Sequence, residues 1–249
     1  MRLEQLVHTV GGSVMVSWRR AGSGGAVVCL HGAGVSSREL LGLVEALGGY
    51  HDAWSVDLPG FGHSGKPPRP LTLVELADAV AGWLAVVGLR RVCLLGGSFG
   101  CQVAVDVCVR YPDLVGALVL AGPTVDPQAR SPLAVLGQWL RNSVRESPRM
   151  TPLNVADYRD AGLRRVMATF GESIRDRVED KLPYVTVPGL VVRGGKDRMV
   201  PQAWAEEVTR QLPQGRLKVM PGLPHMIPYK DPLGLARMVR EFLAEAGAS

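Results

Sequence analysis

Residues 91–104 read Arg-Val-Cys-Leu-Leu-Gly-Gly-Ser-Phe-Gly-Cys-Gln-Val-Ala and contain the pattern G-x-S-x-G from Gly96 to Gly100. The pattern lies at the end of an apolar run that predicts a strand and directly before a predicted helix. A side chain on so tight a strand-to-helix turn needs flanking residues without side chains. The helix N-terminus then offers free N–H groups to a developing negative charge. The segment therefore predicts a nucleophile at Ser98.

Short apolar runs alternate with helical patterns along most of the chain, which is typical of a mostly parallel sheet covered by helices on both faces. We predict an α/β fold with eight strands, at residues 2–8, 13–19, 26–30, 53–58, 91–96, 114–122, 189–194 and 216–220. Predicted helices fall at residues 37–47, 72–87, 99–110, 201–211 and 232–246. The length of 249 residues suits one large domain, with or without an insertion.

The alternation stops between residues 123 and 187. This segment holds two or three helical stretches, no strong strand, and Pro residues at 123, 127, 132, 148, 152 and 183. A connection of this length without sheet partners is unusual unless it carries structure and function. We therefore predict a core formed by residues 1–122 and 188–249, with a small helical cap at 123–187 inserted after the sixth strand.

A second glycine-rich turn follows the predicted strand at 26–30, in the sequence His31-Gly-Ala33-Gly34. Such a turn can bring a backbone N–H, here that of Ala33, close to a bound acyl oxygen. The N–H of Phe99, directly after Ser98, would be the second donor. We interpret His31 as a structural imidazole that braces this loop.

With these motifs the chain resembles the α/β-hydrolase family over nearly its whole length. The resemblance rests on H-G-x-G at 31–34, the loop Asp57-Leu-Pro-Gly-Phe-Gly-His-Ser64, the turn at 96–100 and two later segments. Asp57 is expected to organise the backbone of its loop. One departure is Cys101, where many members of the family carry a second Gly after the turn.

A nucleophilic Ser needs a base, and the base needs an orienting acid. The resemblance implies the order Ser, acid, His, which places the acid at Asp197, after the predicted strand at 189–194, and the base at His225, after the last strand. All three residues follow a strand, so we predict the triad Ser98, Asp197 and His225. Asp126, after the strand that ends at 122, is the alternative acid.

Composition excludes several other classes of protein. The net charge is +5, but the basic residues are spread along the chain rather than clustered as nucleic-acid binding requires. No apolar run approaches the roughly 18–20 residues of a membrane span, and the first residues lack a signal-peptide pattern. No metal-ligand or nucleotide-binding pattern is present, so no metal or other cofactor is expected. The four Cys residues lack C-x-x-C spacing and fit buried thiols in a reduced cytoplasm.

Apolar side chains of the predicted cap are candidates for the substrate pocket: Trp139, Tyr158, Met167 and Phe170. A cap indicates a small or medium, partly apolar substrate as the only expected partner, with homodimer formation left open. The leading hypothesis is a serine hydrolase that cleaves an ester, lactone or thioester through an acyl-enzyme on Ser98. The resemblance also allows carbon–carbon bond hydrolysis of a dicarbonyl compound, a lyase or cyclase that uses the triad as acid and base, or a small-molecule receptor.

Overall fold

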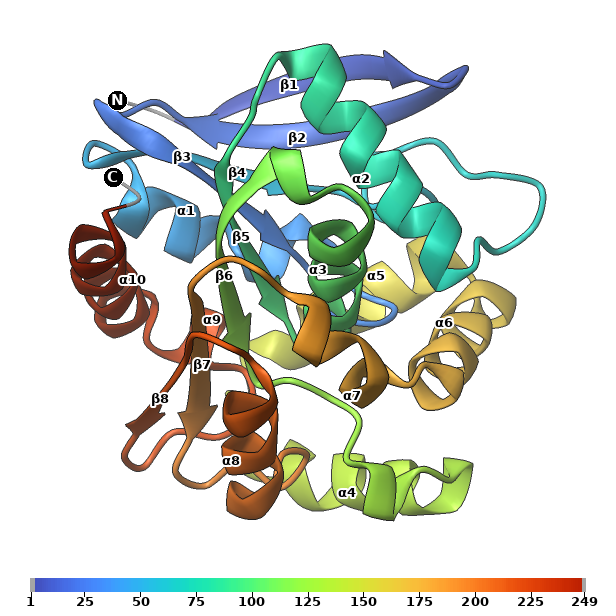
Figure 1. Cartoon of the computed structure of the whole chain (residues 1–249). Helices are drawn as coiled ribbons and strands as arrows, with labels where there is room; N and C mark the ends of the chain where they lie inside the picture. Colours follow the sequence, from blue (N-terminus) through green and yellow to red (C-terminus); the bar gives the residue numbers. More distant parts are fainter. Residues whose placement is uncertain (1–2, 248–249) are drawn as a thin grey trace.

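Eight apolar segments form one sheet in the computed structural model, which describes residues 3–247 (Figure 1). The strands are β1 (Glu4–Val10), β2 (Ser13–Arg20), β3 (Gly24–Leu30), β4 (His51–Val56), β5 (Val92–Gly97), β6 (Val115–Ala121), β7 (Gly189–Gly194) and β8 (Gly215–Met220). They lie in the order β1-β2-β4-β3-β5-β6-β7-β8. Strand β2 pairs antiparallel with β1 and β4, and the remaining neighbours are parallel. The predicted α/β fold with a mostly parallel eight-stranded sheet is confirmed.

Two strands lie at slightly different residues than predicted, and the residues at their ends explain the differences. The first strand was predicted at 2–8 and extends to Val10, because Val10 pairs with Ser13 across a turn of two glycines; residue 2 lies outside the described residues. The fourth strand was predicted at 53–58 but ends at Val56. Asp57 begins the loop after this strand: its amide still donates to Val16 of β2, and its carboxylate accepts hydrogen bonds from loop amides.

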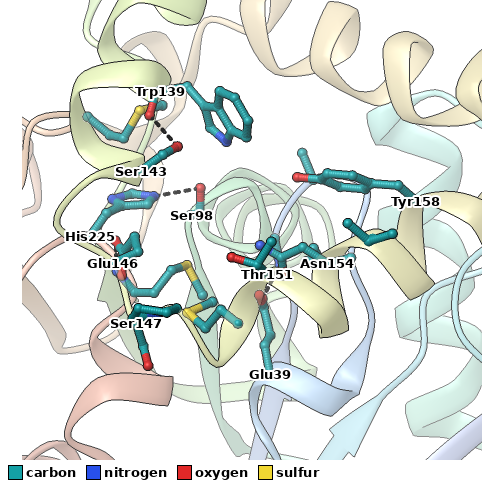
Figure 2. Close-up of a pocket in the computed structure, with 18 of the residues that line it drawn as sticks. Glu39, Ser98, Trp139, Ser143, Glu146, Ser147, Thr151, Asn154, Tyr158 and His225 are labelled. Carbon is teal, nitrogen blue, oxygen red and sulfur yellow. Dashed lines mark hydrogen bonds between the residues drawn. The ribbon is translucent and has the colours of Figure 1, made fainter.

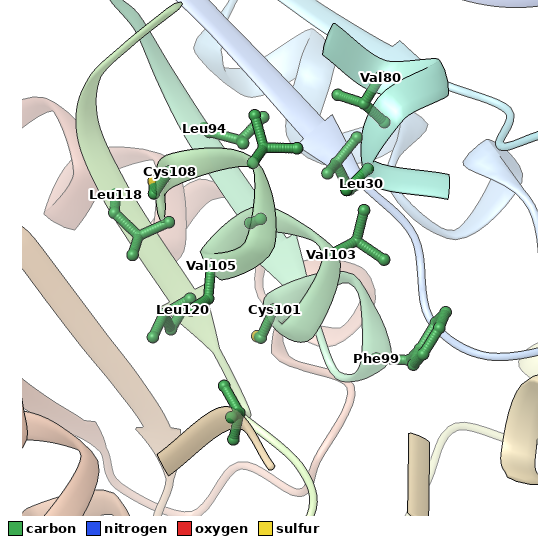
Figure 3. Close-up of a cluster of buried hydrophobic side chains, with 14 of the residues drawn as sticks. Leu30, Val80, Leu94, Phe99, Cys101, Val103, Val105, Cys108, Leu118 and Leu120 are labelled. Atoms are coloured by element: carbon green, nitrogen blue, oxygen red, sulfur yellow. The ribbon is translucent and has the colours of Figure 1, made fainter. Parts of the chain in front are cut away.

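Helices cover both faces of the sheet. Alternate side chains of β5 enter different cores, Leu94 on one face and Cys93 and Leu95 on the other, as the period of two in a strand requires. One face is covered by α1 (Leu41–Leu47) and α10 (Pro232–Ala246), and the other by α2 (Leu73–Val87), α3 (Phe99–Arg110) and α8 (Gln202–Gln211). Figure 3 shows how α3, which begins at Phe99, packs its apolar side chains against the sheet. This packing fixes the helix that begins directly after Ser98.

The segment between β6 and β7 is helical and lies beside the lower edge of the sheet in Figure 1. Its helices are α4 (Pro132–Ser143), α5 (Met150–Ala161), α6 (Leu163–Arg175) and α7 (Val178–Lys181), so the expectation of two or three helical stretches was too low. Gly162, with φ of 81°, separates α5 from α6. We call α4 to α7 the inserted helices.

Short elements complete the described chain. The predicted helix at 37–47 is divided into a 3₁₀ turn, Ser37–Glu39, and α1. Further 3₁₀ turns are Pro112–Leu114, Pro127–Ala129 and Leu182–Tyr184, and α9 spans Ile227–Lys230. Among residues 3–247, no helix has both the length and the hydropathy needed to cross a membrane.

Candidate active site

Ser98 occupies a strained turn between β5 and α3. Its backbone has φ of 51° and ψ of −118°, a conformation that non-glycine residues rarely adopt. A Cβ on Gly96 would lie 2.4 Å from the backbone of Gly100 and Cys101, and a Cβ on Gly100 would lie 2.3 Å from the Leu30 carbonyl oxygen. Both positions therefore require Gly, which explains the G-x-S-x-G pattern in this turn.

The three residues of the predicted triad come together at the carboxyl ends of their strands. His225 Nε2 lies 2.9 Å from Ser98 Oγ, and His225 Nδ1 lies 2.8 Å from Asp197 Oδ2. Asp197 and His225 are buried, with 3% and 6% of their surface exposed. The three side chains form one hydrogen-bonded chain that leads from a buried carboxylate to the Ser hydroxyl.

Asp197 is held in place by its own loop. Its Oδ1 accepts hydrogen bonds from the amides of Met199 and Val200 at 2.7 and 3.0 Å, which leaves Oδ2 for His225. Burial alone would lower the pKa of His225, but the nearby Asp197 carboxylate outweighs it and raises that pKa above the usual value. The alternative acid, Asp126, instead accepts a hydrogen bond from the amide of Gln128 and is not bonded to His225.

The two predicted oxyanion donors are the backbone N–H groups of Phe99, directly after Ser98, and of Ala33. Phe99 is the first residue of α3, so its N–H has no carbonyl one turn earlier to bind. Ala33 lines the same cavity as Ser98. A Cβ on Gly34 would lie 3.0 Å from side-chain atoms of Tyr158 and Val166, so the inserted helices pack closely on this loop.

The residues interpreted as structural do brace these loops. His31 is fully buried, with Nδ1 2.9 Å from the Gly32 carbonyl oxygen and Nε2 accepting from the Leu58 amide at 3.0 Å. Burial lowers the pKa of His31, which suits this neutral pairing. The Asp57 carboxylate accepts from the amides of Ser37 and His63. The structural interpretations of His31 and Asp57 are confirmed.

The cavity at Ser98 has a volume of about 500 Å³, within the range of small-molecule sites. In Figure 2, Ser98 lies at its centre with Trp139 and Tyr158 above and beside it. Trp139, Tyr158 and Phe170 line this cavity, as predicted for pocket residues. The inserted helices and the residues after them supply further lining side chains, among them Ser143, Glu146, Met150, Thr151, Asn154 and Val155.

Met167 was also predicted to line the pocket, but the structure places it elsewhere. It is 60% exposed and lines an adjoining apolar groove between α4 and the pair α5 and α6, which shares Trp139, Tyr158 and Phe170 with the Ser98 cavity. Val166, one residue earlier, is buried, and a rotation of about 100° per helical residue turns Met167 toward solvent. The apolar character of a residue in α6 does not by itself reveal the face on which it lies.

Glu39 is a residue of this site that the sequence analysis missed. It lines the cavity, is 4% exposed, and accepts a hydrogen bond from the Gly32 amide at 2.8 Å. Burial is the main cause that raises its pKa, to about 8. In the sequence, Glu39 reads as an ordinary acidic residue in the first turn of a predicted helix, so its position seven residues after Gly32 gave no signal.

The fold agrees with the comparisons to known proteins. The model of the "Alpha/beta hydrolase family" matches residues 27–238. The chain belongs to the alpha/beta hydrolase family and is an enzyme of the hydrolase type.

Two of the similar curated proteins are named as hydrolases of specific substrates. The chain is 25% identical to 2-(acetamidomethylene)succinate hydrolase of Mesorhizobium japonicum, over 93% of this chain and 92% of that protein. It is 28% identical to 2-hydroxy-6-oxononadienedioate/2-hydroxy-6-oxononatrienedioate hydrolase of Burkholderia vietnamiensis, over 94% and 92%. Among solved structures, a thermophilic esterase from Thermogutta terrifontis superposes with a TM-score of 0.83 at 22% identity, covering 98% of this chain and 99% of that one. At that identity, the structural likeness concerns the fold.

Proposed function

We propose that this protein is a serine hydrolase that cleaves an ester, lactone or thioester through an acyl-enzyme on Ser98. The observation that carries the proposal is the hydrogen-bonded chain from Asp197 through His225 to Ser98, at 2.8 and 2.9 Å. This is the arrangement in which an imidazole can take the proton of a hydroxyl while a carboxylate stabilises the resulting cation. The strained turn at Ser98 supports the same role, because it holds the hydroxyl at the cavity.

In the first half of the reaction, His225 Nε2 takes the proton of Ser98 Oγ as that oxygen attacks the acyl carbon. Negative charge then develops on the acyl oxygen. The N–H groups of Ala33 and Phe99 would bind this oxygen, and the N-terminus of α3 adds its partial positive charge. Asp197 orients His225 and stabilises its imidazolium.

In the second half, His225 gives its proton to the leaving group, which departs and leaves the acyl group on Ser98 Oγ. Water enters, His225 takes a proton from it, and the resulting nucleophile attacks the acyl carbon. The acid product leaves, and the proton returns to Ser98. We propose that the inserted helices act as a cap that limits access of bulk water to this step.

Carbon–carbon bond hydrolysis by the same triad is the second candidate. It is favoured by the relative whose name gives 2-hydroxy-6-oxononadienedioate, an oxo acid without an ester bond, as the substrate. Product analysis separates the two candidates: simple acyl esters and a vinylogous diketone are offered in parallel to the same enzyme. Faster cleavage of the diketone would replace the ester proposal by the carbon–carbon proposal.

A rapid-quench experiment tests the acyl-enzyme itself. With a 4-nitrophenyl ester, we expect a burst of nitrophenol and a matching mass increase on the protein before steady turnover. Ser98→Ala should abolish both. Turnover that is retained in Ser98→Ala, or that depends on His225 without any acyl-enzyme, would favour the lyase or cyclase chemistry instead.

The proposed location is the cytoplasm. It is supported by the four Cys residues, all of which are buried and lack a disulfide partner in the described chain. Thiols of this kind are typical of proteins in a reducing compartment.

A further inference from the structure

Glu39 reaches the cavity from the loop beside the proposed oxyanion donors. Figure 2 shows its side chain rising from the cavity floor toward the Gly32 amide, below Ser98. Glu39 Oε1 and Ser98 Cβ lie 3.4 and 3.5 Å from the point that a Cβ on Gly32 would occupy. Only the space of one missing side chain therefore separates this carboxyl group from the proposed nucleophile.

The two oxygens of Glu39 have different surroundings. Oε1 accepts the hydrogen bond from Gly32, and this is the only hydrogen bond of the Glu39 side chain among residues 3–247. Oε2 makes no hydrogen bond among the described residues, yet it is not fully buried, and Glu39 lines the cavity. Oε2 therefore faces the space where a substrate would lie.

The groups around Glu39 favour its un-ionised form. Burial is the largest influence on the pKa of Glu39 and raises it. The Gly32 N–H and His225 lower this pKa, whereas Asp157 on α5 and Glu146 raise it, and the result is about 8. Tyr158, also on α5, lies in the same cavity; burial is the main cause that raises its pKa to about 12, and the charge of Glu39 adds to this. At neutral pH, Oε2 then carries a proton and can donate a hydrogen bond.

No Lys or Arg side chain among the described residues balances these carboxyl groups inside the cavity. Among the described residues that line it, Glu39 and Glu146 are the acidic ones and none is Lys or Arg. The nearby Arg38 is engaged by Asp157 at 2.6 Å. A substrate carboxylate would therefore lose its water without gaining a charged partner.

We propose that Glu39 is a specificity-determining residue: its un-ionised carboxyl group donates a hydrogen bond to an uncharged oxygen of the substrate, and the cavity rejects substrates that carry a carboxylate. The inference rests on the proposed function and narrows its substrate class to uncharged acyl compounds with an acceptor oxygen near the acyl group. It separates this enzyme from the relatives whose names give a succinate or a dioate as substrate.

Two esters that differ only at one terminal group, an uncharged methyl ester or a free carboxylate, test the inference: methyl 4-nitrophenyl adipate and mono-4-nitrophenyl adipate. Their kcat/KM values are compared from about pH 6.5 to about pH 9.5, where the free carboxyl group of the second ester stays ionised. The titration of His225 affects both esters alike and cancels in the ratio of the two kcat/KM values. In the wild type, we expect that ratio, anionic over neutral, to fall about tenfold further as Glu39 ionises near its raised pKa.

Variants assign the effect to Glu39. In Glu39→Gln, which keeps a donor but cannot ionise, the ratio should stay constant with pH and the neutral ester should keep most of its kcat/KM. Glu39→Leu should lose about tenfold on the neutral ester, mainly in KM. Glu45→Gln, the same substitution at an exposed position of α1, should behave as the wild type.

A ratio that is independent of pH in the wild type, or equal losses in Glu39→Gln and Glu39→Leu, would overturn the inference and indicate that Glu39 only braces the Gly32 loop. Absence of any Ser98-dependent turnover would instead contradict the proposed function. In that case, calorimetry with dimethyl adipate and adipate still tests whether the cavity selects uncharged ligands. Binding of the diester alone supports the charge selection, and tighter binding of adipate refutes it.

Discussion

Asp157 on α5 accepts hydrogen bonds from both the amide and the hydroxyl of Ser36, each at 2.9 Å, although 121 residues separate the two in sequence. The same carboxyl group pairs with Arg38 at 2.6 Å. Asp157 is 4% exposed, so these bonds are shielded from water. They tie the inserted helices to the loop that carries Ala33, and the shape of the Ser98 cavity depends on this connection.

Asp157→Ala should therefore weaken both stability and the site. It leaves the Ser36 amide and Arg38 without their buried partner, which costs about 3 kcal/mol in the free energy of unfolding. Urea denaturation measures this loss, and kcat/KM should fall with it. Asp160→Ala removes an exposed partner of the same Arg and should change the free energy of unfolding by less than about 1 kcal/mol. Equal effects of the two changes would contradict the anchoring role of Asp157.

Gly100→Ala tests the turn at Ser98. Its Cβ would lie 2.3 Å from the Leu30 carbonyl oxygen, so the turn must shift, and we expect a loss of more than about 2 kcal/mol in stability together with loss of activity. Gly137→Ala, in α4, is the matched control because no atom lies within 4 Å of its new Cβ. It should raise stability by about 0.5–1 kcal/mol, since Ala favours a helix interior. Thermal unfolding of the two variants gives the comparison.

The activity should decline in acid through the titration of His225. Its pKa is raised in the folded protein, so the protonated form, which cannot act as a base, persists to a higher pH than usual. We expect kcat/KM to fall as the pH drops through a value above about 6.5. In Asp197→Asn, this limb should move to lower pH and kcat should fall by about 10³-fold or more. An acid limb at the same pH in both proteins would show that another group controls the rate.

The buried thiols should be inert in the folded protein. Burial raises the pKa of all four, that of Cys93 to about 12, so almost no thiolate is present at neutral pH. A colorimetric thiol reagent should find no reactive group in the native state and four in denaturant. Rapid labelling of any Cys in the native protein would contradict this arrangement.

The sequence predicted those parts of the site that lie at strand ends. Ser98, Asp197 and His225 each follow an apolar run, and parallel strands bring their carboxyl ends to one edge of the sheet. Glu39 and Asp157 were not predicted, because the burial of a carboxyl group depends on packing that the sequence pattern does not show. Asp157, for example, bonds to Ser36 across 121 residues. The prediction for Met167 was wrong for a related reason. The sequence shows which residues of α6 are apolar, but it does not show which part of the protein each face of the helix contacts.

The most direct test of the account is intact mass after treatment with a small fluorophosphonate. The account predicts a single adduct on the wild type and on Ser13→Ala, an exposed Ser far from the site in sequence, and no adduct on Ser98→Ala. That result requires an activated hydroxyl at Ser98. A folded wild type without an adduct, or an adduct that persists in Ser98→Ala, would contradict the assignment of Ser98 as the nucleophile.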